Sequence, residues 1–340
     1  MNKPISMALI LCLCSLSVFA KEWVSPIDQK YAAKNSLLFA TFSEAREILD
    51  SWSGQGKKLI EADVLLKSVL EADSNYAPAY REYGRLFTMA GVIDEDSYSQ
   101  NSLELAEASI LKAIEIEPKY ADAFVLLGHV YTVMKQDNAA KKALVKAQKI
   151  GTKIPWLPLN WAALYAKQKQ YKKAQHYYEL ALKAGGLNKK AYLSALDGVI
   201  NTSMQTLQYD KANAAYQKQI AYDETQAWNW GNYSSFLLFN YNDVDAAIFN
   251  GQKAISLMDY GMARFTLACA FYTKWAQLLQ GNHDIAAKQY FDKAWALYPY
   301  PERVIQMTRN YKATEVTAKE LQKWLDNRPV KTPYYQLSIG

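Results

Sequence analysis

Small and apolar residues recur at helical spacing along most of the chain. Ala140, Leu144 and Ala147 follow one another at steps of four and three residues, which places them on one face of an α-helix. Six further trios with this spacing are Ala62/Leu66/Val69, Ala106/Ile110/Ala113, Ala174/Tyr178/Ala181, Ala212/Tyr216/Gln219, Ala247/Gly251/Ala254 and Ala287/Phe291/Ala294. The trios that begin at Ala106, Ala140 and Ala174 are 34 residues apart, and the other intervals run from 35 to 44 residues. Intervals of this size, with helical periodicity inside them, predict an array of helical repeats.

A second helical pattern precedes the trio. Its signature is two large residues, a small residue and an aromatic residue on one helix face. It stands at Phe124/Leu127/Gly128/Tyr131, again at Tyr80/Tyr83/Gly84/Phe87, and in part at Trp161/Ala162/Tyr165. Pro118 and Pro299 follow the second helix of their units, where a helix should end. The repeating unit is therefore a pair of helices.

This pattern resembles the tetratricopeptide repeat, a helix-turn-helix unit of 34 residues. The matching residues are Phe124, Leu127, Gly128, Tyr131, Ala140, Leu144, Ala147 and Pro118. The resemblance covers about six to seven units and implies an all-α fold, a right-handed superhelix (α-solenoid) with a concave groove. The physical basis is that Gly128 and Ala140 allow two helices to cross closely. Each pair then leaves an apolar face that the next pair must cover.

The pattern divides the chain into five segments. We expect a signal peptide at 1–20, an N-terminal lead-in at 21–42, the repeat solenoid at 43–299, C-terminal capping helices at 300–328 and a tail at 329–340. The register of the repeat near 227–247 is ambiguous by about one helical turn. No inward face is assigned there, and Trp228 is a groove residue in only one of the registers.

The first twenty residues differ from the rest. Lys3 precedes an apolar run from Met7 to Val18, which is too short to span a hydrocarbon core about 30 Å thick. With Ala20 at the end of this run, the pattern predicts a secretory signal peptide and an exported chain, in the periplasm of a Gram-negative envelope. A retained anchor helix, secretion and lipid anchoring are the alternatives. Leucines precede Cys12 and Cys14, where lipoprotein processing needs a small residue.

Composition excludes several classes of function. With 50% apolar and 21% charged residues the chain can bury a large core. Its formal net charge of +6 is mild and its basic residues are scattered, so we expect no nucleic-acid partner. No stretch after the first twenty residues is apolar enough to span a membrane. Removal of the signal peptide leaves Cys269 as a single thiol, whose apolar helical context predicts a buried small hydrophobe.

No catalytic pattern stands out. His129, His176 and His283 fall in different units, without partners at metal-ligand spacing. The stretch SGQGKK at 53–58 lacks the phosphate-loop pattern, and the carboxylates are dispersed. We therefore expect no enzyme activity, no metal and no cofactor, and His129 is interpreted as a groove histidine without metal.

The resemblance implies which side chains face the groove. The inward candidates for partner binding are Arg81, Arg85, Val125, His129, Thr132, Trp156, Leu159, Ala163 and Lys167. Arg81 and Arg85 are one turn apart and can grip a carboxylate through charge-assisted hydrogen bonds, with two solvated arginines as the alternative. The lysine-and-asparagine clamp of cytosolic chaperone-binding tetratricopeptide proteins is not reproduced.

Three functions are open at this point. The first is a non-enzymatic protein-protein interaction scaffold of the bacterial cell envelope, which binds a protein or peptide partner segment in the concave groove. The second is an accessory protein of envelope polysaccharide export or cell-wall assembly, with groove aromatics in contact with a glycan. The third is an enzyme or a regulatory subunit of one.

Overall fold

The computed structural model describes residues 23–94, 97–185 and 187–327. Within these ranges the chain is all-α, as predicted, with seventeen α-helices, one π-helical turn and one short 3-10 helix. An isolated antiparallel bridge joins Val92 to Tyr98. The predicted signal peptide and the tail at 329–340 lie outside the described residues. Over the described ranges, no helix combines the length and the apolar character needed to cross a bilayer.

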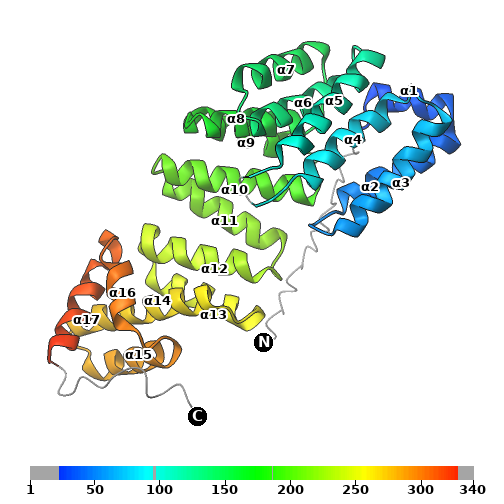
Figure 1. The fold of residues 1–340 in the computed structure, drawn as a ribbon. Coiled ribbons are helices and arrows are strands. Elements are labelled where there is room, and N and C mark those ends of the chain that lie inside the picture. The colour runs from blue at the N-terminus through cyan, green and yellow to red at the C-terminus, as the bar shows by residue number, and fades with distance from the viewer. Residues whose placement is uncertain (1–22, 95–96, 186, 328–340) are drawn as a thin grey trace, which may run out of the picture. The chain divides into compact units, whose positions relative to one another are not determined.

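The chain divides into two compact units (Figure 1). Unit 1 contains residues up to 168 and 176–192, and unit 2 contains 169–175 and the residues from 193 onward. Unit 1 holds α1 (Pro26–Lys34), α2 (Ser36–Asp50), α3 (Gly56–Ala72), α4 (Ala77–Ala90), α5 (Gln100–Ile116), α6 (Ala121–Val133), α7 (Asp137–Ile150) and α8 (Trp156–Lys167). Two helices contribute to both units, namely α9 (Tyr171–Ala184) and α10 (Lys189–Gln205). Unit 2 holds α11 (Tyr209–Tyr222), α12 (Ala227–Phe236), the π turn η1 (Leu237–Tyr241), α13 (Val244–Leu257), α14 (Gly261–Gln280), α15 (Asp284–Leu297), α16 (Pro301–Thr308), η2 (Lys312–Thr314) and α17 (Glu315–Asn327).

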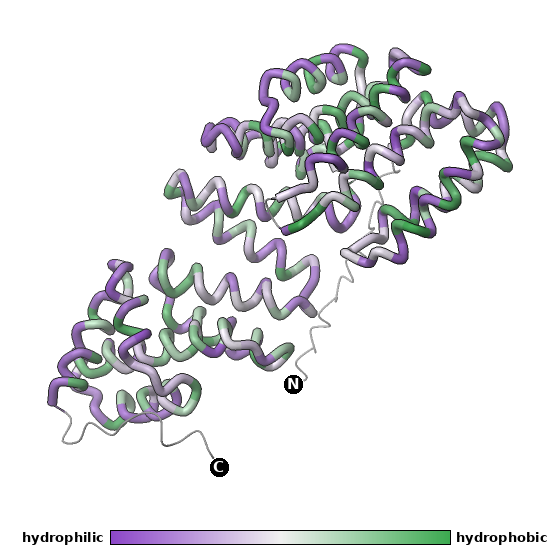
Figure 2. Tube along the Cα trace, in the orientation of Figure 1, coloured by the Kyte–Doolittle hydropathy of each residue, from purple (hydrophilic) through white to green (hydrophobic). Residues whose placement is uncertain are grey.

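Consecutive helices pack as pairs that cross at the predicted small residues. The pairs include α4 with α5, α6 with α7, and α14 with α15. A Cβ added to Gly84 would lie 2.3 Å from Cγ1 of Ile110, and one added to Gly128 would lie 2.5 Å from Cδ2 of Leu144. The first alanine of each trio is fully buried, namely Ala62, Ala106, Ala140, Ala174, Ala212, Ala247 and Ala287. Hydrophobic and hydrophilic positions alternate along the helices in Figure 2, as this one-sided packing requires.

The first pair begins before the predicted boundary at 43. Helix α2 starts at Ser36, where the Asn35 side chain accepts a 3.0 Å hydrogen bond from the backbone N–H of Leu38. Asn35 also ends α1, so a single residue separates these two helices. This short connection leaves α1 little freedom in where it can pack.

The register near 227–247 is settled by a serine and a π turn. Ser234 takes the small position of α12, and its hydroxyl donates a 2.7 Å hydrogen bond to the Ala247 carbonyl of α13. The π turn η1 then adds a residue to the helix before it ends at Asn242, which has a left-handed φ of 59°. The substitution of serine for glycine and the widened turn explain why the repeat pattern was ambiguous here.

The last two helices cover the end of the unit 2 core. Thr317 of α17 is fully buried and donates a 3.0 Å hydrogen bond to the Thr273 hydroxyl of α14. Leu321, one turn further along α17, is also fully buried. The charged residues of α17 lie at the surface, and its buried side covers the apolar face of α14.

Candidate functional site

The predicted inward side chains share a face on each of three helices in unit 1. Arg81 and Arg85 lie on α4, the residues Val125, His129 and Thr132 lie on α6, and the residues Trp156, Leu159, Ala163 and Lys167 lie on α8. Side chains three or four residues apart share a helix face. We call the surface formed by these side chains the inner face of unit 1.

Helix α1 packs on the first part of this inner face. Asp28 of α1 is 2% exposed and accepts a 2.5 Å hydrogen bond from the Tyr120 hydroxyl. Nη1 of Arg46 lies 3.3 Å, and Nη2 of Arg81 lies 3.9 Å, from its other carboxylate oxygen. One buried carboxylate therefore joins α1 to α2, to α4 and to the residue that precedes α6.

The residues before α1 continue onto α6. Trp23 Nε1 donates a 3.1 Å hydrogen bond to one carboxylate oxygen of Asp122, and the Thr152 hydroxyl donates a 2.7 Å bond to the other. Burial raises the pKa of the Asp122 carboxyl, and the Arg81 charge and these two hydrogen bonds partly offset the rise. The segment from Trp23 to the end of α1 is thus held on the inner face by hydrogen bonds as well as ion pairs.

The carboxylates gripped by the two arginines belong to the chain itself. Arg81 is 7% exposed and forms an ion pair with Glu82. Arg85 lies 2.7 Å from Glu82 and 2.6 Å from Asp50. Burial alone would raise the pKa of Glu82, but the charges of Arg81 and Arg85 hold it below its usual range. Both arginines are therefore paired with carboxylates of the chain, with Arg81 buried and Arg85 partly buried.

Three other inward candidates are also buried. Val125 is 2% exposed and Leu159 is 5% exposed. The Thr132 hydroxyl donates a 2.8 Å hydrogen bond to the Gly128 carbonyl in the preceding turn. Among the candidates that remain, Lys167 is exposed, while His129, Trp156 and Ala163 are partly buried. The accessible inner face of unit 1 therefore runs from the middle of α6 along α8.

His129 lies on α6, beside the turn whose Val125 carbonyl is bound by Asn160 of α8. Asn160 hydrogen-bonds to the imidazole and donates through Nδ2 to the Val125 carbonyl at 3.4 Å. Burial lowers the pKa of His129, the Asn160 bond opposes this, and the charges of Lys167 and Lys190 lower the pKa further.

Lys190 comes from the start of α10 and contacts the loop after α2. Its Nζ lies 5.7 Å from the centre of the Trp52 ring, a cation–π contact within unit 1. Sequence analysis identified His129 and Lys167 as inward residues but missed Lys190, Trp52 and Asn160. The repeat pattern carries no signal for the contact between Trp52 and Lys190, which lie 138 positions apart. The position of Asn160, in contrast, could have been predicted, because it lies one turn before the inward residue Ala163.

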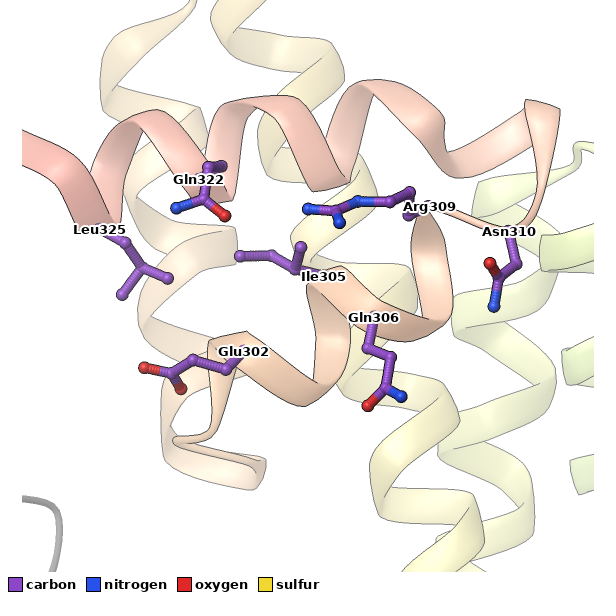
Figure 3. Close-up of a pocket in the computed structure, with 7 residues that line it drawn as sticks. All are labelled: Glu302, Ile305, Gln306, Arg309, Asn310, Gln322 and Leu325. Atoms are coloured by element: carbon purple, nitrogen blue, oxygen red, sulfur yellow. The ribbon is translucent and has the colours of Figure 1, made fainter.

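A separate hollow lies between α16 and α17 of unit 2. Figure 3 shows Ile305 and Leu325 between polar side chains, with Arg309 extending between the two helices. The cavity has a volume of about 460 Å³ and is lined by Glu302, Ile305, Gln306, Arg309, Asn310, Gln322 and Leu325. None of the predicted inward residues lines it.

The described residues offer no constellation for metal chemistry or thiol catalysis. In the parts of the chain that the structure covers, no three His, Cys, Asp or Glu side chains are placed to hold a metal ion. Cys269 is fully buried, as its apolar context predicted, and burial raises the pKa of its thiol. A thiol held in its neutral form is a poor nucleophile.

The paired helices, their close crossings at small residues and their spacing define a fold of the tetratricopeptide repeat type. Proteins of this class use the faces of stacked repeats as extended binding surfaces. No protein-family profile matches the chain.

The chain is similar to a type IV pilus assembly protein, PilF of Pseudomonas aeruginosa. The two are 28% identical over 134 residues, which are 39% of this chain and 49% of PilF. The match thus spans about half the length of that relative.

Among solved structures, the fold is similar to that of PilW, a type IV pilus biogenesis factor. The TM-score is 0.53 at 18% identity, over 67% of this chain and 97% of PilW. It is also similar to a chain of the Cut9–Hcn1 assembly of the anaphase-promoting complex, with a TM-score of 0.54 at 14% identity over 72% of this chain and 45% of that one. At these identities the likeness shows the fold alone.

Proposed function

We propose that the chain is a non-enzymatic protein-protein interaction scaffold whose inner face of unit 1 binds a segment of a partner protein. The observation that carries this proposal is the packing of α1. This face already holds a helix through a buried carboxylate at Asp28 and an indole at Trp23. The same face continues past α1 to His129, Trp156 and Lys167, where side chains are accessible to a second segment.

The setting that we propose is the bacterial cell envelope, in the assembly of a surface filament of the type IV pilus class. Two observations support it. One is the sequence similarity to PilF over about half the length of that protein. The other is the signal-peptide pattern of residues 1–20, which predicts export.

Site-specific photo-crosslinking in cells tests the proposal. A photoreactive amino acid at Ala163 on α8 places the probe on the accessible inner face, and the same amino acid at Lys142 on α7 places it on an exposed position of the paired helix. We expect a discrete protein adduct from position 163 and none from position 142. Adducts of equal yield from both positions, or none from either, would count against a binding surface on the inner face.

An aromatic pair in unit 2, in which Trp228 is exposed and Tyr260 is partly buried, supports a second candidate, glycan binding. Trp228 is 50% exposed, and its ring centre lies 4.1 Å from that of Tyr260. Exposed indole rings can stack on sugar faces. A glycan array distinguishes the two functions, because saturable binding that Trp228→Ala abolishes would favour the polysaccharide role.

A further inference from the structure

A groove with an aromatic lining crosses three consecutive helices of unit 1, α3, α4 and α5 (Figure 1). Its volume is about 380 Å³, and none of the predicted inward residues lines it. On α4 the rings of Tyr83 and Phe87 stack with their centres 5.7 Å apart. The other lining side chains are Lys67, Leu70 and Glu71 of α3, Tyr80 of α4 and Ser109 of α5. The groove is therefore a surface separate from the inner face of unit 1.

Helix α3 carries an exposed apolar pair that continues the line of this groove. Ile60 is 66% exposed and Val64 is 61% exposed. Steps of four, three and four residues then lead to Lys67 and Glu71, so all four side chains share one helix face. This face is about 16 Å long, because an α-helix rises 1.5 Å per residue.

The other two helices add further apolar surface. Leu105 of α5 is 43% exposed and lies one turn before Ser109, which lines the groove. The hydroxyls of Tyr80 and Tyr83 donate hydrogen bonds of 3.2 Å and 3.3 Å to backbone carbonyls within unit 1. Their polar atoms are thus engaged in the chain, and their rings line the groove as apolar surface.

The repeat itself does not require aliphatic residues at the exposed positions of α3. Ile60 and Val64 stand two residues before and two residues after Ala62, the first alanine of its trio. Of the seven trios, only this one has an apolar residue at both positions. In α7 the same two positions hold Asn138 and Lys142, which are also exposed. An exposed apolar surface that packing does not explain indicates a binding surface.

The groove also offers one base and one acid to a ligand. Lys67 and Glu71 are exposed, and over the described residues neither side chain forms an ion pair or a hydrogen bond. The preceding pair on α3 differs, because Lys57 and Glu61 lie 3.9 Å apart. A ligand with an acid and a base about one helical turn apart would complement both free charges.

We propose that an amphipathic helix of a protein partner packs along this groove, with its apolar side chains on Ile60, Val64 and Leu105. An acid and a base beside its apolar face would pair with Lys67 and Glu71. The exposed face of α3 spans about three helical turns, enough for anchors spaced as i, i+3 or i+4, and i+7. A helix is favoured over an extended segment, because it brings no unpaired backbone groups to helices whose own are already bonded.

A second copy of the chain is a less suitable occupant. If α3 packed on α3 of another copy across a two-fold axis, Ile60 of each copy would meet Val64 of the other. The same register would place Lys57 of each copy beside Lys67 of the other, and like charges repel. A partner helix can instead match the charges on both sides of its apolar face.

Fluorescence anisotropy on the full chain, with synthetic peptides, tests the proposal. The probe is a stapled helix of about fourteen residues, with leucine along one face and both glutamate and lysine beside it. Comparison peptides keep the leucine face but carry glutamate alone or lysine alone, and a scrambled peptide has no apolar face. We expect saturable binding of the mixed peptide. Either single-charge peptide should bind more weakly, since it leaves Lys67 or Glu71 unmatched, and the scrambled peptide should not saturate.

Two double variants separate the groove from general hydrophobicity. Ile60→Ser with Val64→Ser should weaken binding of the mixed peptide about tenfold or more, because it removes apolar area that the peptide covers. Leu207→Ser with Ile285→Ser removes two aliphatic side chains of unit 2 that are 71% and 83% exposed, and should change the affinity by no more than about twofold. Both variants should keep the melting temperature of the parent chain, because all four positions are exposed.

A third double variant tests the charges. With Lys67→Gln and Glu71→Gln, the mixed peptide should lose its preference over the single-charge peptides. A preference that persists, equal losses in the two aliphatic variants, or a mixed peptide that binds no better than the scrambled one would overturn the inference. A dimer in sedimentation velocity that Ile60→Ser with Val64→Ser abolishes would also overturn it, and would assign the groove to a second copy. The proposal for the inner face stands apart from these outcomes, since the adduct at position 163 tests it.

Discussion

The close helix crossing at Gly128 allows a quantitative test of what holds each pair together. In Gly128→Ala the new Cβ would lie 2.5 Å from Cδ2 and 2.7 Å from Cγ of Leu144. Carbon atoms pack favourably at about 3.5–4.0 Å. Leu144 is fully buried, and the clash reaches its branch point, so a simple rotation of the side chain cannot relieve it. The two helices must move apart or Leu144 must leave its rotamer.

The expected size follows from two opposing effects. Overpacking of a dense core costs about 1–3 kcal/mol. Alanine in place of glycine inside a helix raises the free energy of unfolding by up to about 1 kcal/mol. Gly128→Ala should therefore lower the free energy of unfolding by about 1–2 kcal/mol. In a Leu144→Ala background the clash is absent, so the same substitution should be neutral or stabilising, and the coupling energy between the two positions should be about 2 kcal/mol.

Urea unfolding followed by circular dichroism measures these values. Gly56→Ala is the control, because Gly56 is the first residue of α3 and an added Cβ there meets nothing within 4 Å. It should leave the free energy of unfolding unchanged or raise it by up to about 1 kcal/mol. If Gly128→Ala were as stable as Gly56→Ala, or if its effect were the same with and without Leu144, the close crossing would not be a determinant of the fold.

Three further predictions concern buried groups. Asp28→Asn should lower the free energy of unfolding by about 3 kcal/mol, since it removes the buried carboxylate that pairs with Arg46 and accepts the Tyr120 hydroxyl, and it leaves Arg81 with Glu82 alone. Lys34→Gln, which removes an exposed ion pair, should cost less than about 1 kcal/mol; equal costs would show that α1 is not held by Asp28. The folded pKa of Glu82 lies below its ordinary value of 4.5, so the stability it contributes is present above that pH and is lost as the pH falls through the folded pKa. Unfolding measured from pH 6 to pH 3 should show this loss, and Glu82→Gln should reduce the slope; an unchanged slope would contradict the buried network. Burial raises the pKa of Cys269, so mass spectrometry should find it alkylated by iodoacetamide only after unfolding, and rapid labelling of the native chain would exclude the buried position.

The helix pairs could be predicted because their signals are local. Gly128, Ala140 and Leu144 lie within seventeen residues of one another, and helical spacing alone puts them on facing surfaces. Export and the tail fall on residues outside the described ranges and stay predictions. The register near Ser234 was ambiguous because a serine replaces the expected glycine and a π turn follows it.

For the inner face of unit 1, the sequence predicted the kind of interaction that the arginines make but not the residues that they bind. Arg81 and Arg85 do grip carboxylates, but these belong to Asp28, Glu82 and Asp50. The Glu82–Arg85 pair was readable from its spacing of three residues. The bond between Asp28 and Tyr120 joins residues 92 positions apart, and no repeat pattern records which segment before the first pair folds back onto it.

Hydrogen exchange of the chain with and without the crosslinked partner tests the central claim most directly. If a partner segment lies on the inner face of unit 1, peptides from α6 and α8 should gain protection in the complex. Peptides from the paired helices α7 and α9 should exchange as they do in the free chain. Protection confined to α7 and α9, or to unit 2 alone, would contradict the account.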